Sequence, residues 1–121
     1  MFEHVDLEDS FVLGWHFDTE SRRLVFDLEA SLWKGHEHYT KPLPDEFTCY
    51  KRAQLVFENV ETIDGLLPMD EATFSIDPDG SVDYGVVEGF HQSGNNIYKL
   101  GGDYGEVTVE CENVRLEFNN Y

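Results

Sequence analysis

The chain of 121 residues has the size of one domain and is strongly acidic: 25 Asp and Glu residues against 8 Lys and Arg give a formal net charge of -17. This charge disfavours binding to nucleic-acid phosphates or anionic lipid, because both require surplus positive charge. With 40% hydrophobic and 14% aromatic residues, the chain is too apolar for a disordered acidic tail, and its apolar runs are too short for a membrane-spanning helix. We therefore expect a single domain over residues 1–121 with no nucleic-acid or membrane partner.

Alternation of apolar and polar residues, which is typical of half-buried strands, begins near the N-terminus. Four large apolar residues there share one parity and are expected to face the core together: Phe11, Leu13, Trp15 and Phe17. Residues 18–21 are predicted to form a turn. The next strand is predicted over residues 24–32, where every even position is apolar. The sequence thus predicts a hairpin.

Residues 34–46 interrupt this strand pattern. The segment, KGHEHYTKPLPDE, has 13 residues, two prolines and no alternation. Connections of this length are uncommon in compact domains and are often functional. It also contains two of the five histidines and directly follows a tryptophan. We expect a recognition loop here, with four candidate binding residues: Trp33, His36, His38 and Tyr39.

The remainder of the chain continues in the same style. Five further strands are predicted up to residue 100: Phe47–Glu58, Val60–Leu66, Ala72–Asp77, Val82–Phe90 and Asn95–Leu100. A helical turn is expected over residues 67–71, where Pro68 suits a first position, and residues 77–80 have strong turn chemistry.

Apolar residues in the last strand change parity. Residues 106–111 alternate cleanly, and residues 114–118 continue with the opposite parity, so a bulge or tight turn is expected at Glu112–Asn113. About eight or nine short strands at close spacing predict an all-β fold, either an antiparallel β-sandwich or a small β-barrel.

Cys49 and Cys111 are the only cysteines, too few for a disulfide scaffold or a four-cysteine zinc site. A bridge between them would require a fold that brings their strands together. The N-terminal segment MFEHVDLEDS has neither the basic nor the apolar region of a secretory signal. These features predict a cytoplasmic protein with two reduced thiols.

Two patterns bear on metal binding. On a strand, His36 and His38 would point to one side and could ligate zinc, copper or iron, but no third ligand stands at a diagnostic spacing. Five side chains repeat the spacing of a calcium loop at relative positions 1, 3, 5, 7 and 12: Asp77, Asp79, Ser81, Asp83 and Glu88. Val82 occupies the position that needs Gly, so a hairpin turn with exposed carboxylates explains them better. We expect neither a metal nor a cofactor.

Function is best predicted from the distribution of charge. No GxSxG, HExxH or P-loop motif occurs, so no catalytic residue is assigned and a binding role is favoured over an enzymatic one. From Ala53 to Tyr98 the chain has nine carboxylates and no Lys or Arg. Such a surface either only keeps a protein soluble or attracts a basic partner.

The leading hypothesis is a small acidic protein-binding module, an inhibitor or immunity-type partner of a basic protein. Five candidate residues lie in the acidic stretch: Asp77, Asp79, Asp83, Tyr84 and Glu88. The alternative is a small-molecule-binding or enzymatic β-barrel with the 34–46 loop at the mouth of its pocket. A third possibility is a subunit whose partner covers a strand edge.

Overall fold

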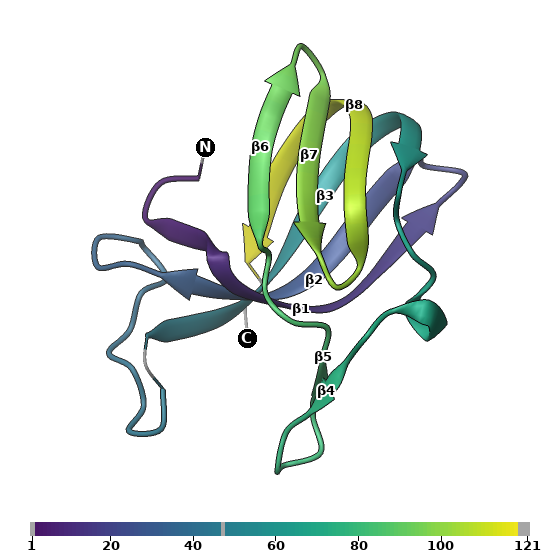
Figure 1. The fold of residues 1–121 in the computed structure, drawn as a ribbon. Coiled ribbons are helices and arrows are strands. Elements are labelled where there is room, and N and C mark those ends of the chain that lie inside the picture. The colour runs from purple at the N-terminus through teal and green to yellow at the C-terminus, as the bar shows by residue number, and fades with distance from the viewer. Residues whose placement is uncertain (1, 47, 119–121) are drawn as a thin grey trace.

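The structure, a computed structural model, describes residues 2–46 and 48–118 (Figure 1). In these residues, the chain forms eight strands: β1 (Val5–Asp18), β2 (Arg23–Leu32), β3 (Cys49–Asp64), β4 (Ser75–Ile76), β5 (Val82–Asp83), β6 (Gly89–Gly94), β7 (Ile97–Gly102) and β8 (Gly105–Phe118). One 3₁₀ turn spans Met69–Glu71, within the predicted helical turn. The all-β prediction is confirmed, although four of the strands are long rather than short.

Six of the strands form one antiparallel sheet in the order β1-β2-β3-β8-β7-β6, and β4 and β5 form a separate hairpin. The sheet is not closed, so the β-barrel prediction is wrong. An isolated bridge between Phe11 and Val86, with a few backbone hydrogen bonds beside it, links β1 to the segment that precedes β6. Two strands predicted separately, on either side of Asn59, are continuous in β3; Phe47, predicted to begin the first of them, lies outside the described residues.

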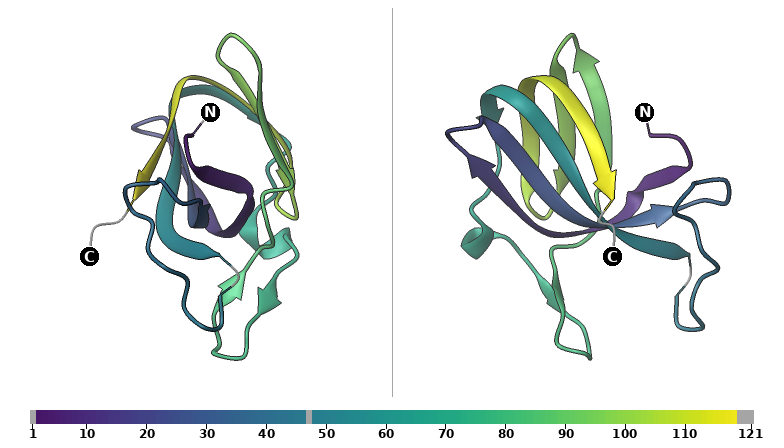
Figure 2. Two further views of the ribbon diagram at one scale, coloured as in Figure 1. Left: turned by 90° about the vertical axis from the view of Figure 1, so that its left-hand side faces the viewer. Right: turned by 180° about the vertical axis from the view of Figure 1, so that it is seen from behind.

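A bend shared by β3 and β8 gives the sheet two layers. Phe57 and Val60 both face the core, with two outward residues between them, and Asn59 there has a left-handed backbone (φ 53°). The inward-facing residues of the partner strand β8 change from odd to even positions at the same level, where Glu58 pairs with Asn113. The bulge or tight turn predicted at Glu112–Asn113 is wrong, because β8 continues through these residues and the register shift of the ladder lies in β3, between Val60 and Thr62. Because both strands bend, the two halves of the sheet cover a common core, as Figure 2 shows from two sides.

Aromatic rings from both layers fill this core. Tyr104, between β7 and β8, is fully buried and meets Phe26 of β2 edge-on, with ring centroids 5.3 Å apart. Its ring centroid also lies 5.9 Å from that of Trp15, whose indole N–H donates a hydrogen bond to the Leu67 carbonyl at 3.0 Å. Each buried ring contributes about 1.5–3 kcal/mol through the removal of apolar surface from water. The core therefore joins the layers.

The prediction that four residues of β1 face the core together is wrong. Register shifts interrupt the β1–β2 pairing before Phe11 and after Val12. As a result Val12 and Trp15 are buried, whereas Phe11 and Leu13 are only partly covered and line an outer groove. Bulges change which face a residue occupies, and strict alternation in the sequence does not reveal them.

The two cysteines are free and buried. Cys111 belongs to the main core, and Cys49 to a smaller cluster beside it with Val5, Ala30 and Leu32. In the described residues, the structure contains no helix with the length and apolar character needed to cross a bilayer.

Candidate binding surfaces

The β4–β5 hairpin projects away from the six-stranded sheet (Figure 1). Its turn is held by its own side chains: Ser81 donates to the Asp79 carboxylate from its backbone N–H (2.9 Å) and its hydroxyl (2.6 Å). The same hydroxyl lies 3.2 Å from the Asp77 carboxylate. The two hydrogen bonds that Ser81 donates to Asp79 lower the pKa of that carboxyl group. The spacing that resembles a calcium loop is therefore explained by a hairpin turn.

Three large apolar side chains of this hairpin are exposed. Ile76 and Val82 are cross-strand partners with 65% and 40% of their surfaces exposed, and Phe74 is 54% exposed. Phe74 stands immediately before β4, with its ring centroid 6.3 Å from that of Tyr84. These apolar side chains stay exposed because the two-residue ladder of β4 and β5 has no second layer packed over it. We call Phe74, Ile76 and Val82 the apolar triad.

The other candidate residues of the acidic stretch lie at the base of the hairpin or beyond it. Tyr84 is partly buried, packing edge-on against Trp15 with ring centroids 5.0 Å apart. The Asp83 carboxylate accepts a hydrogen bond from the Gly85 N–H at 2.9 Å. Glu88 lines a separate hollow of about 230 Å³ that also contains Lys99.

A groove of about 330 Å³ separates the hairpin from the outer side of the sheet. It is lined by Phe11, Leu13, Glu29, Arg52, Asp77, Ser81, Val82 and Asp83. Two of the predicted residues, Asp77 and Asp83, thus share this groove. Arg52 and Glu29 face each other across the β2–β3 ladder. The groove therefore mixes both charge signs, in contrast to the exposed side of the hairpin.

The loop over residues 34–46 packs against the smaller cluster. The His36 and His38 rings each lie 4.8 Å from the Phe118 ring and 5.6 Å from each other. Burial, together with the positive charge of neighbouring His38, lowers the pKa of His36. Tyr39 packs on the same cluster as Cys49. These three loop residues therefore cover hydrophobic surface.

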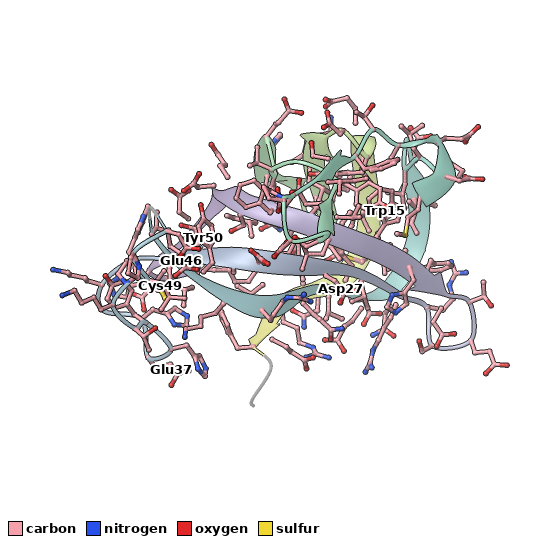
Figure 3. All side chains as sticks on the ribbon, turned by 90° about the horizontal axis from the view of Figure 1, so that it is seen from below. Trp15, Asp27, Glu37, Glu46, Cys49 and Tyr50 are labelled. Carbon is pink, nitrogen blue, oxygen red and sulfur yellow. The ribbon has the colours of Figure 1, made fainter. Side chains whose placement is uncertain are left out.

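The sequence contains a possible metal-binding pattern in the 34–46 loop and another in residues 77–88. In residues 2–46 and 48–118, no three or more His, Cys, Asp or Glu side chains are arranged to hold a metal ion. Seen from below (Figure 3), Glu37 and Glu46 of the loop lie near one end of the molecule, whereas Trp15, against which Tyr84 packs, lies in the other half. The candidates from the loop and those from the acidic stretch therefore do not form one site.

Trp33 stands apart from the rest of the loop. Its side chain is 55% exposed and borders a cavity of about 440 Å³ between the start of β1 and β6. This cavity is lined by Phe2, Val5, Asp6, Leu7, Glu8, Trp33, Phe90, His91 and Gln92. Except for Trp33, none of these residues was a candidate from the sequence, because the cavity depends on the strand order.

Comparisons with known protein families, curated proteins and solved structures find no match to this chain. Function is therefore inferred from the chemistry of the hairpin, the loop and the cavity.

Proposed function

We propose that this chain is a small acidic protein-binding module that docks onto a basic protein through its β4–β5 hairpin, as an inhibitor or immunity-type partner would. The observation that carries the proposal is the exposed apolar triad on a hairpin whose turn bears Asp77 and Asp79. Apolar anchors surrounded by polar groups are the usual anatomy of an interface hot spot. The hairpin thus presents apolar side chains that could anchor a partner, together with negatively charged carboxylates.

Charge around the triad defines the partner. Residues 53–98 contain nine carboxylates and no Lys or Arg. Within the described residues, Glu58 forms ion pairs with Arg115 at 2.9 Å and with Arg23 at 3.5 Å. The remaining negative field would speed encounter with a cationic surface and repel an acidic one. A partner with a basic surface and an apolar pocket therefore fits the hairpin best.

Salt-stepped affinity capture with matched variants tests this proposal. One bait has three neutral hairpin side chains: Asp77→Asn, Asp79→Asn and Asp83→Asn. A control bait with the same net charge has three neutral side chains on other elements: Glu3→Gln, Glu20→Gln and Glu112→Gln. We expect a basic protein to be retained by the wild type and the control, and to elute as the Debye length falls from about 10 Å in 0.1 M salt to about 3 Å in 1 M salt.

The apolar half of the surface has its own variant. Ile76→Ser with Val82→Ser removes two exposed apolar side chains, so folding should be preserved. We expect the affinity for the captured protein to fall by about tenfold or more, as for the loss of a hot spot. Equal retention by all of the baits, or binding that does not respond to salt, would contradict the proposal.

Two further inferences from the sequence belong with this proposal. The free thiols of Cys49 and Cys111 support a cytoplasmic location, where reduced cysteines are usual. The small-molecule alternative is not favoured, because it needs the mouth of a closed barrel and the sheet is open.

A further inference from the structure

The open sheet has a seam where its two terminal strands approach each other. Next to this seam the segment before β6 is hydrogen-bonded to β1: the Val12 N–H donates to the Gly85 carbonyl at 2.8 Å, and the Tyr84 N–H donates to the Val12 carbonyl at 2.7 Å. The Val87 N–H donates to the Ser10 carbonyl at 3.0 Å. The two strands are antiparallel here, since Phe11 and Val86 form an antiparallel bridge.

Towards the start of β1 this pairing ends. If the Phe11–Val86 register continued, Leu7 would stand opposite Phe90, but β1 and β6 are not hydrogen-bonded neighbours. The cavity of about 440 Å³ lies in their place, lined by residues 5–8 of β1 and 90–92 of β6. The register shift between Asp6 and Phe11 accompanies this separation. An edge strand leaves backbone N–H and carbonyl groups on its free side.

We propose that this seam binds an extended, basic segment of a protein partner, which is added as a strand between β1 and β6. Such strand addition supplies backbone hydrogen bonds for affinity, while alternate side chains supply specificity. Val5 and Leu7 of β1 are turned to the core, so one face of the added strand would meet apolar surface. Its other face would meet Asp6 and Glu8.

The negative charge beside the seam favours a basic segment as its ligand. Asp6 and Glu8 line the cavity, and no Lys or Arg is among its lining residues. A second copy of this chain, with a net charge of -17, would be repelled, whereas Lys or Arg side chains at alternate positions of a strand would be attracted. Trp33 at the rim, 55% exposed, offers an aromatic face to such a cation or to an apolar side chain. This site is separate from the hairpin.

The test uses the full chain and three synthetic hexapeptides, each acetylated and amidated. The first alternates Lys and Val, the second is the same peptide with N-methyl groups on alternate backbone nitrogens, and the third alternates Glu and Val. Binding is followed by amide NMR shifts and by hydrogen exchange. We expect only the Lys–Val peptide to bind, with shifts at residues 5–8 and 90–92 and exchange at these edges slowed by about tenfold or more.

Paired variants separate this site from the hairpin. Asp6→Asn with Glu8→Gln should weaken binding of the Lys–Val peptide by about fivefold or more, whereas Asp77→Asn with Asp79→Asn should leave it unchanged. Failure of the Lys–Val peptide to bind would overturn the proposal. Equal binding of the N-methylated peptide would also overturn it and indicate a site for small ligands, and shifts confined to residues 74–84 would assign the peptide to the hairpin instead.

Discussion

Replacing Tyr104 by Phe removes one hydroxyl from the centre of the core. That hydroxyl donates a hydrogen bond to the Gly101 carbonyl at 2.7 Å, in a residue with no exposed surface. The Gly101 carbonyl also accepts a bond from the Glu88 N–H at 2.9 Å, so it keeps one partner in the variant. The loss is therefore that of a hydrogen bond rather than that of a stranded polar group, about 0.5–1.5 kcal/mol.

The packing of the Tyr104 ring is expected to contribute more to stability than its hydroxyl. Phe retains the edge-on contacts with Phe26 and Trp15, whereas Tyr104→Ala would remove them and leave a cavity, at a cost of about 3–5 kcal/mol. Since domains of this size are stable by only about 5–15 kcal/mol, the Ala variant is expected to be marginally folded. For the Phe variant we expect a fall in Tm of about 2–8 °C.

Urea denaturation followed by tryptophan fluorescence measures both effects. Tyr98→Phe is the matched control, because Tyr98 is also largely buried, with 8% of its surface exposed, and its hydroxyl makes no side-chain hydrogen bond among the described residues. We expect that control to change the free energy of unfolding by less than about 0.5 kcal/mol. If Tyr104→Phe destabilises the protein no more than Tyr98→Phe does, the hydrogen bond to Gly101 does not contribute as described.

Two further predictions concern the core and the bend. Burial raises the pKa of Cys111 to about 11; the unfolded thiol therefore loses its proton first, so stability should fall as the pH rises from about 9 to 11, by up to about 2–3 kcal/mol. Cys111→Ala should reduce this fall in urea titrations at pH 8 and 10.5, and an unchanged slope would exclude the thiol as its cause. At the bend, Asn59 has a φ of 53°, so Asn59→Val should destabilise the fold by about 1–3 kcal/mol, whereas Asn59→Gly should be nearly neutral. Equal stability of these two variants would contradict a requirement for left-handed backbone there.

Local alternation in the sequence predicted the fold class and some of its details. The even positions of β2 face inward because that strand pairs in continuous register with β3. The change of parity at residues 112–113 was visible because it leaves two adjacent polar residues between apolar ones. The orientation of Phe11 and Leu13 was not predictable in this way, because the bulges in β1 arise from its pairing with β2.

Some features of the candidate binding surfaces could be predicted from the sequence, and others could not. Composition was enough to identify the acidic stretch, and the turn at residues 77–80 placed Asp77 and Asp79 together. The exposure of Phe74 and Ile76 was missed, because an apolar residue in a strand-like segment is ordinarily assigned to the core. The two-residue length of β4 and β5 was the missing information. The seam could be predicted only with knowledge of the strand order, because β1 and β6 are distant in sequence and approach each other only in the folded chain.

The central place of β8 in the sheet has a consequence for how the chain folds. Residues 105–118 follow every other described strand in the chain and are therefore synthesised after them, yet they join β3 to β7. Before they are available, the β1-β2-β3 unit and the β6-β7 hairpin have no strand in common, and both present open edges that favour aggregation. Because contacts such as Phe57 with Val114 span much of the chain, we expect the core to form late and slowly, on the timescale of milliseconds to seconds. During that interval, the excess of Asp and Glu over Lys and Arg in the chain would keep incompletely folded chains apart by mutual repulsion.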